Sequence, residues 1–274
     1  MCGRYASAKD PAALVEEFEV DESRVDEPLP ADYNVAPTKE VYAVMTRRAE
    51  AADDASTEDT PSRQLRVVRW GLVPSWAKDR AIGSRMINAR SETLAEKPAF
   101  RRAFGKRRCL LPADGYYEWY TPQNAEAATT AKGKPKKQPF YIHRADGGSL
   151  AMAGLYEWWC DPAIERDDPG AWLLSATIIT TNAADAVGRI HDRMPVVVHA
   201  DDWETWLDPA VNERETVENL MHPAMTAQLD AYPVSIRVNN VRNNGSELID
   251  PLPTDDALPG SVGADGFWPP PHDA

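Results

Sequence analysis

A cysteine occupies position 2, directly after the initiator methionine. Because cysteine is small, Met1 can be removed, which leaves the α-amine of Cys2 beside its own thiol as a 1,2-aminothiol. The reference pKa values are about 7.7–8.0 for the amine and about 8.5 for the thiol, so part of the amine is nucleophilic at neutral pH. Such a pair captures an aldehyde first as a Schiff base and then as a five-membered thiazolidine. A cysteine here can also be incidental, so the other motifs decide.

Arginine and tryptophan residues in nearby motifs suit a nucleic-acid strand. Arg4 follows the cysteine closely enough for its guanidinium to hold a phosphate. The stretches WGLVPSW and MINARSE add Trp70, Trp76, Asn88 and Arg90. Tryptophan faces stack on bases and arginine clamps phosphate. Packing of the two tryptophans in the core is the competing interpretation, and the sequence leaves it open.

Two further motifs carry groups that move protons. Glu118 lies in PADGYYEW, where apolar neighbours can raise its pKa and suit it to proton transfer. The alternative is a glutamate that points outward by strand alternation. In IHDRMP, His191 is followed by Asp192, which can orient it, and by Arg193, which can meet an anion. A lone histidine is more often structural.

The charge of the chain is strongly acidic, with a formal net charge of -13. That balance is not typical of a DNA-binding protein and fits either a solvated surface or a molecule that avoids polyanions. Its distribution is uneven, because ten basic and three acidic residues occupy 78–108, whereas acidic residues gather in 49–60, 161–168 and from Asp250 onward. A positive band of this kind fits a nucleic-acid groove or a helix with a solvated basic face.

The cysteine count and hydropathy restrict the class of protein. Cys2, Cys109 and Cys160 are far apart, with no spacing typical of a disulfide framework or a metal site, so we expect no metal. No apolar run has the length of a membrane span and the N-terminus is no signal peptide. We therefore expect a soluble cytoplasmic monomer that does not contact membranes.

Short runs rich in β-branched and aromatic residues predict a strand-dominated core. These runs are 41–46, 65–70, 107–111, 115–120, 139–143, 150–156, 172–181 and 194–198. Helical patterns that open with capping-type residues cover 10–19, 91–104 with a break at Pro98, 182–190 and 201–207. The predicted class is α+β with mixed or antiparallel sheets.

The composition predicts one domain over residues 1–252. Loop insertions are expected at 49–64, 121–138 and 161–170, where the chain is acidic or rich in Lys, Gly and Pro. Residues 253–274 have the composition of a disordered acidic, proline-rich tail.

Taken together, these motifs resemble the SRAP (SOS response-associated peptidase) family. The match runs in order through MCGRYA, YNVAPT, WGLVPSW, INARSET, EKPAFRRAF, CLLPADGYYEW, KQPFYIHRADG, TIITTNA, IHDRMPVVV and YPVSIRVNNVRNNGSELIDPL. The resemblance implies a single domain whose twisted mixed and antiparallel sheets form a barrel-like core with peripheral helices. It implies no cofactor.

The resemblance also implies a function. A protein of this kind binds single-stranded DNA at replication forks, crosslinks to the ring-opened aldehyde of an abasic site as a thiazolidine, and shields the lesion from cleavage and error-prone synthesis. Its partners would be single-stranded DNA with abasic sites and replication-fork proteins, and it would join the nucleoid when bound to DNA.

Site roles are carried over by motif. Cys2 would be the nucleophile, Asn88 would orient its amine or the sugar, and Glu118 would be the general acid and base. His191 would assist Schiff-base formation and reversal, a lyase-like step. Glu118 would also help to remove Met1 by autoproteolysis.

The resemblance assigns a second set of residues to DNA binding. They are Arg4, Asn34, Trp70, Trp76, Arg90, Lys97, Thr180 and Arg193. One position departs from the pattern, because Ala77 stands where some relatives carry a second aromatic residue, so wedge stacking would rest on Trp76 alone.

Two other functions stay open at this point. An N-terminal-nucleophile hydrolase or thiol peptidase would use Cys2 to attack an amide, with His191 or Glu118 moving the proton. A non-covalent reader of modified single-stranded DNA would use the basic band and the tryptophans, with Cys2 idle.

Overall fold

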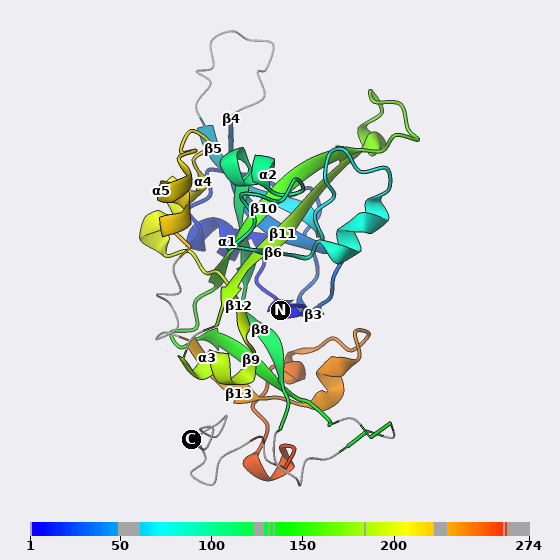
Figure 1. Ribbon diagram of the computed structural model, residues 1–274, viewed down its shortest axis with the longest axis vertical. Coiled ribbons are helices and arrows are strands. Elements are labelled where there is room, and N and C mark those ends of the chain that lie inside the picture. Colours follow the sequence, from blue (N-terminus) through cyan, green and yellow to red (C-terminus); the bar gives the residue numbers. More distant parts are fainter. Residues whose placement is uncertain are drawn as a thin grey trace.

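The fold consists of two β-sheets stacked along the long axis of the molecule, with short helices around the upper one (Figure 1). The structure is a computed structural model. It describes residues 2–48, 61–122, 129–130, 132–133, 135–183, 185–221, 229–259 and 261.

The larger sheet closes into a five-stranded barrel. Its strands are β4 (Glu40–Arg48), β5 (Pro61–Trp70), β7 (Arg108–Ala113), β10 (Leu150–Cys160) and β11 (Trp172–Asn182). Neighbours along the path β5-β4-β7-β10-β11 pair antiparallel. A short parallel pairing, Ser175 with Arg69 and Ala176 with Trp70, joins β11 back to β5 and closes the ring. The predicted barrel-like core is confirmed.

Alternating side chains fill the barrel and cover its outside. Met45, Leu111 and Ile178 belong to the buried cluster inside. The outer face is covered by four short helices: α1 (Pro11–Glu17), α2 (Arg101–Lys106), α4 (Trp203–Leu207) and α5 (Arg214–Asn219). The buried guanidinium of Arg108 donates to the carbonyls of Trp206 and of Asp208, both at 2.6 Å, and so ties α4 to β7.

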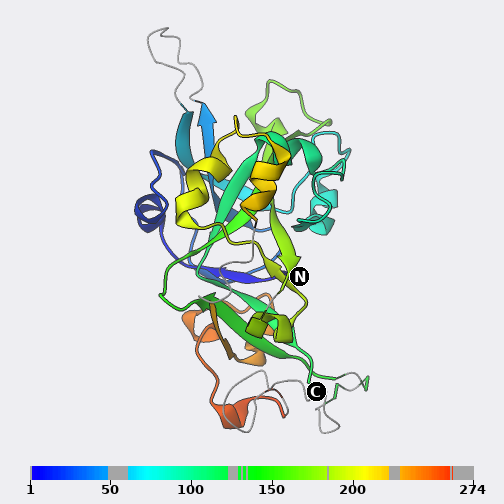
Figure 2. The ribbon, with the colours of Figure 1, turned by 60° about the vertical axis from the view of Figure 1, so that its left-hand side comes forward.

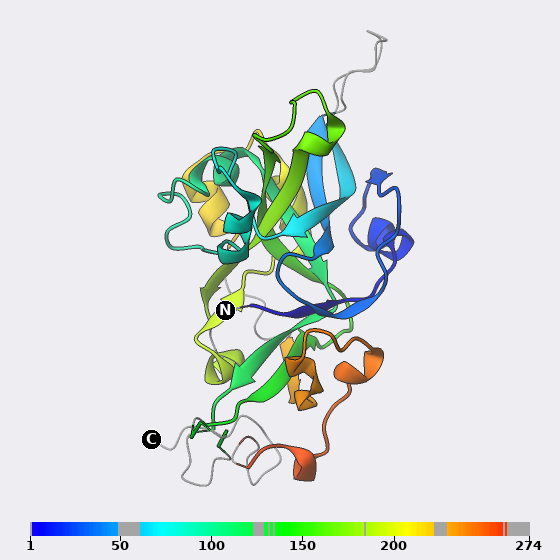
Figure 3. The same cartoon turned by 90° about the vertical axis from the view of Figure 1, so that its right-hand side faces the viewer.

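The second sheet carries the N-terminus of the chain. Its order is β13 (Leu229–Pro233), β9 (Gln138–Arg144), β8 (Gly115–Tyr120), β1 (Tyr5–Ser7) and β3 (Asp32–Val35). Both neighbours of β1 run antiparallel to it. Figures 2 and 3 show β1, in blue, crossing between the barrel and the lower strands.

Shorter elements complete the fold around these sheets. They are β2 (Glu22–Arg24), β6 (Asn88–Arg90), β12 (Arg193–Pro195), α3 (Asp185–Ile190) and the 3-10 turns η1 (Arg80–Arg85), η2 (Pro169–Ala171), η3 (Ala200–Asp202), η5 (Ile236–Asn239), η6 (Ser246–Leu248) and η7 (Thr254–Asp256). β6 and β12 both pair with β11. Among the described residues, no helix is both long and apolar enough to cross a bilayer.

Most predicted elements are present, and their ends differ for local reasons. The first helix begins as expected, with the Asp10 side chain accepting from the backbone of Ala13. The helix predicted at 91–104 is wrong over most of its length: residues 91–100 form turns and only α2 is helical. Pro98 lacks a backbone N–H and disfavours a helical residue before it, which explains the delay.

The predicted loop boundaries need three corrections. The insertion predicted at 121–138 ends one residue earlier, because Gln138 already belongs to β9. Residues 49–60 lie outside the described part of the chain, but 61–64 already belong to β5 and are not an insertion. The tail does not begin at 253, because the amide of Leu258 donates to the Gln138 side chain at 3.0 Å and Ser261 is buried. The remainder of the predicted tail, 262–274, lies outside the described residues.

A glycine in β8 tests the tight packing beside this strand. A Cβ atom at Gly115 would lie 2.6 Å from the Tyr141 hydroxyl and 2.7 Å from the Ile142 carbonyl oxygen. We expect Gly115→Ala to lower the free energy of unfolding by about 1–3 kcal/mol, measured by urea denaturation. Gly105→Ala is the control, because nothing lies within 4 Å of its added Cβ. Helix propensity should make that variant more stable by about 0.5–1 kcal/mol. Equal stability of the two variants would contradict the packing.

Candidate active site

Cys2 lies three residues before β1 and is fully buried. Tyr5 pairs with Tyr116, and the amide of Tyr117 donates to the Arg4 carbonyl at 2.9 Å. Because the pairing is antiparallel, the segment before Tyr5 continues beside the later residues of β8. The side-chain amide of Asn88 donates to the Cys2 carbonyl at 2.8 Å. Pairing with β8 and the hydrogen bond from Asn88 of β6 therefore hold the segment of the candidate nucleophile from two different strands.

Asn88 is positioned by the short strand β6. Parallel pairing sets Asn88 beside Ile178 of β11, and the indole N–H of Trp70 donates to the carbonyl of Ile87 at 3.0 Å. The Asn88 Oδ1 atom is buried and has no hydrogen-bond partner among the described residues. One end of this amide is therefore bound to Cys2, and the other end retains an acceptor.

Glu118 projects from β8 and is buried. Burial raises the pKa of this carboxyl from 4.5 to about 7; the charge of Asp192 adds to the increase, whereas Lys137 opposes it. Burial also raises the pKa of the Cys2 thiol, and the charge of Glu118 raises it further. The two groups are thus electrostatically coupled, and both favour their protonated forms.

His191 follows α3, the helix that packs against β8. Burial lowers the pKa of its imidazole, which the charge of Asp192 opposes. Its Nδ1 atom lies 3.0 Å from the Arg193 amide nitrogen and 2.8 Å from Asp192 Oδ1. A neutral ring accepts from the amide and carries its proton on Nε2, whereas a charged ring donates to Asp192.

Arg193 is buried within a network of its own. Its guanidinium donates to both carboxylate oxygens of Glu92, at 2.5 and 3.0 Å, to Asn182 at 2.7 Å and to the carbonyl of Thr180 at 2.6 Å. Hydrogen bonding from Arg193 holds the pKa of Glu92 below its usual value. Arg193 and Thr180 therefore brace β11, β12 and the turn after β6, and sequence reasoning missed Glu92 as their partner.

Arg4 and Asn34 form a second internal brace. Arg4 Nη1 donates to Asn34 Oδ1 at 2.7 Å and to the carbonyl of Val238 at 2.9 Å. The amide of Asn34 donates to the carbonyls of Asn240 and Asn243 at 3.1 and 2.9 Å. This pair fastens the segment around η5 to β1 and β3. Asn34 itself is fully buried.

The predicted DNA-binding residues divide into exposed and buried groups. Trp76 is 60% exposed, and Arg90 and Lys97 are also at the surface. Trp70 is fully buried and meets Tyr5 edge to face with ring centroids 5.0 Å apart. Stacking of a base on Trp70 does not fit this burial, because the ring packs in the barrel core.

The basic band of residues 78–108 is divided in the same way. Its exposed members are Lys78, Arg80, Arg85, Arg90, Lys97, Arg101, Arg102 and Lys106. Arg107 instead pairs with Glu157 at 2.6 Å, and Arg108 is buried against backbone carbonyls. Lys137, whose charge acts on both Glu118 and His191, was not predicted. Lys137 directly precedes β9, and the pairing of β9 with β8 brings it near the site. The sequence around Lys137 does not reveal that pairing.

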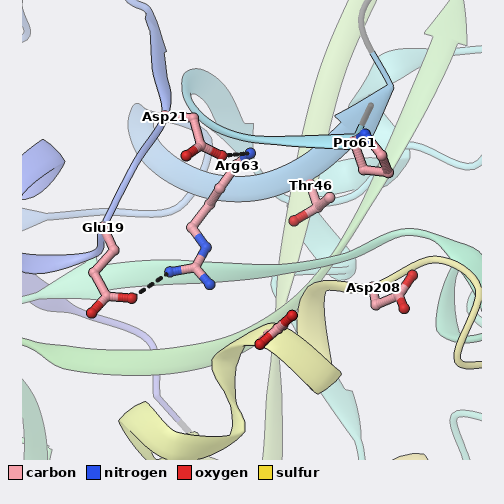
Figure 4. Close-up of a pocket in the computed structure, with 7 residues that line it drawn as sticks. Glu19, Asp21, Thr46, Pro61, Arg63 and Asp208 are labelled. Carbon is pink, nitrogen blue, oxygen red and sulfur yellow. Dashed lines mark hydrogen bonds and ion pairs between the residues drawn. The ribbon is translucent and has the colours of Figure 1, made fainter. Parts of the chain in front are cut away.

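A separate hollow at the start of β5 is acidic, unlike the basic band (Figure 4). It is lined by Glu19, Asp21, Glu204 and Asp208 around Arg63. The Arg63 guanidinium donates to Glu19 at 3.3 Å and the Arg63 amide donates to Asp21 at 2.7 Å. Excess carboxylate repels a phosphate backbone. Within the described residues, no group of three His, Cys, Asp or Glu side chains could hold a metal ion.

Similar proteins share both the sequence and the architecture. Abasic site processing protein YoqW of Bacillus subtilis is 36% identical over 251 residues, 91% of this chain and 99% of its own. Abasic site processing protein YedK of Escherichia coli is 32% identical, over 92% of this chain and 100% of its own.

A solved structure from Bacteroides thetaiotaomicron matches with a TM-score of 0.72 over 92% of this chain and 100% of its own, at 24% identity, which shows the same fold. The family model described as SOS response associated peptidase (SRAP) matches residues 1–241. The chain belongs to the SRAP family.

Proposed function

We propose that this protein captures the aldehyde of abasic sites in single-stranded DNA covalently through Cys2, once Met1 has been removed. The observation that carries the proposal is the buried Cys2, whose carbonyl is held by Asn88 and whose thiol is coupled to a carboxyl with a pKa of about 7. Relatives that align with nearly the whole chain are named abasic site processing proteins, which supports the choice of substrate.

The reaction follows from the protonation states of these groups. The amine nitrogen of Cys2 bonds to the aldehyde carbon, and loss of water gives the Schiff base. The thiol then adds across the C=N bond: sulfur bonds to carbon and the nitrogen gains the proton, which closes the thiazolidine. Because its raised pKa keeps the thiol protonated, the amine reacts first. Glu118 donates a proton to the departing hydroxyl and later recovers one.

Asn88 and His191 have supporting roles in this proposal. The free Oδ1 of Asn88 accepts a hydrogen bond from the Cys2 amine and so directs its lone pair toward the aldehyde. The neutral ring of His191 carries its proton on Nε2, where it can be transferred during formation or reversal of the Schiff base. In this proposal Asn88 orients the amine through a hydrogen bond and His191 transfers a proton, and neither needs to carry a charge.

The DNA strand is proposed to follow the exposed part of the basic band. Trp76 offers a face for stacking, and Arg90 and Lys97 offer phosphate contacts. We do not assign phosphate contacts to Arg4 and Arg193, because their guanidinium groups already bind Asn34 and Glu92. In this proposal they stabilise the site from inside. Phosphate contacts lose affinity as the salt concentration rises, so equilibrium binding weakens at high salt and covalent capture becomes important.

An external peptidase is the weaker alternative. A thiol hydrolase needs a thiolate at working pH, whereas burial and the charge of Glu118 raise the pKa of the Cys2 thiol. Within this proposal, autoproteolysis is confined to removal of the chain's own Met1, assisted by Glu118.

Loss of the aminothiol should abolish the adduct. We expect intact-mass measurement to show a one-to-one adduct of the Met1-free protein with an abasic oligonucleotide, and none with an undamaged strand. Cys2→Ala should form no adduct. Cys2→Ser should form only a Schiff base that borohydride traps, because its hydroxyl is a poor ring-closing nucleophile. A processed wild-type protein that forms no adduct would refute the proposal.

The rate of capture should depend on pH in a bell-shaped manner. Capture needs a neutral amine, with a reference pKa of about 7.7–8.0, and a protonated Glu118, whose pKa is about 7. The rate should therefore rise to a maximum between these values and then fall. In Glu118→Gln the falling limb should disappear and the rate should drop by about 10²–10⁴-fold. Glu204→Gln, in the distant acidic hollow, should keep the bell. An unchanged profile in Glu118→Gln would remove this residue from the mechanism.

The same carboxyl should cost stability at high pH. Its folded pKa of about 7 lies above the unfolded value near 4.5, so its stabilising contribution is complete below pH 4.5 and is lost as the pH rises through 7. We expect Glu118→Gln to match the wild type at pH 4 and to be more stable by about 3 kcal/mol at pH 8, measured by urea denaturation at each pH. Glu204→Gln is the control. A difference that is equal at both pH values would contradict the shift.

A further inference from the structure

The barrel has an incomplete seam between β5 and β11. These strands pair only through Arg69 with Ser175 and Trp70 with Ala176. Before that pairing, β5 and β11 do not pair with each other in the described structure. Residues 67–68 of β5 pair there only with β4, and residues 172–174 of β11 pair only with β10. A groove of about 750 Å³ opens there. Figure 3 shows β5, in cyan, beside the green strands β10 and β11. The volume suits a small organic ligand.

Two tryptophans form the aromatic lining of this seam groove. Trp158 and Trp172 both line it. The Arg47 guanidinium lies 5.6 Å from the ring centroid of Trp158. Likewise, the guanidinium of Arg166 lies 5.3 Å from the ring centroid of Trp172. Indole faces backed by guanidinium groups suit a flat aromatic ligand that carries negative charge.

Both signs of charge border the groove. Arg24, Arg66 and Arg69 line it together with Asp26, Glu27 and Glu40. Two of the arginines have partners, since Arg24 pairs with Glu22 at 2.7 Å and Arg66 donates to Gln64 at 2.9 Å.

Two donors at the groove lack an acceptor. The Nε atom of Arg69 and the Nε1 atom of Trp158 are buried and have no hydrogen-bond partner among the described residues. Buried donors are almost always satisfied by protein, water or a ligand, so these two require an acceptor from outside the described residues.

We propose that the seam groove binds a mononucleotide. The base stacks on Trp172, whose ring is the more exposed of the two, and the phosphate is held by Arg66 and Arg69. The rim carboxylates accept hydrogen bonds from sugar hydroxyls and base amines. The same carboxylates repel a polyanion, which favours a single nucleotide over a DNA strand. The groove contains none of Cys2, Asn88, Glu118 or His191, so this site does not depend on the proposed crosslinking.

Adenosine 5′-monophosphate (AMP) is a suitable probe, titrated calorimetrically into the full-length wild-type protein. AMP has no free aldehyde and cannot be captured by Cys2, so a failure of crosslinking leaves this measurement unaffected. We expect saturable one-to-one binding. Trp172→Ala should weaken it at least about fivefold through loss of stacking. Arg69→Gln should weaken it by about tenfold, because a hydrogen-bonded charge is lost. Unchanged thermal unfolding would show that each variant is folded.

Controls separate this groove from the DNA path and stacking from anion binding. Trp76→Ala, next to the exposed basic band in sequence, should bind AMP with unchanged affinity. Adenosine and inorganic phosphate should each bind at least tenfold more weakly than AMP. The proposal is overturned if AMP does not saturate, if Trp76→Ala abolishes binding, if both groove variants bind normally, or if inorganic phosphate alone binds as tightly as AMP.

Discussion

The pairing of β1 with β8 is the interaction on which the site depends. Chain termini usually fray, and a reactive residue at position 2 would then have no fixed surroundings. Here β1 is held between β3 and β8, and Cys2 and Tyr5 continue into the barrel core cluster. Tyr5 meets Trp70, which in turn binds the segment that leads to Asn88. A single pairing therefore connects the N-terminus, the barrel and the amide that holds Cys2.

Arginines in this fold serve two different purposes. Arg4, Arg108 and Arg193 are spent inside, where their planar guanidinium groups satisfy carbonyl and carboxylate oxygens of segments distant in sequence. Bracing of this kind stabilises a site built mainly from loops and very short strands. The whole chain has 43 acidic residues against 30 lysines and arginines, which gives a formal net charge of -13. In the proposed function, attraction for DNA is therefore local and rests on the exposed basic band.

The sequence predicts the long strands better than the short elements that join them. Strands such as 172–181 can be recognised because their runs of β-branched and aromatic residues are longer than a turn. β1 and β6 have three residues each, too short for any periodicity, and they form only because β8 and β11 offer open edges. The sequence leaves the burial of Trp70 open and does not reveal Glu92 as the partner of Arg193, because both depend on contacts across more than one sheet edge.

Burial acts on the three titratable groups of the site in one direction, toward neutrality. It raises the pKa of the Cys2 thiol and of Glu118 and lowers that of His191. A neutral site neither repels an anionic strand nor pairs permanently with it, and each group still holds or accepts a proton near neutral pH. Desolvation is the largest cause of each of these shifts, so the same packing that fixes the geometry also has the main effect on the proton chemistry. A substitution that admits water beside Glu118 would disturb both together, even where it touches none of the reacting atoms.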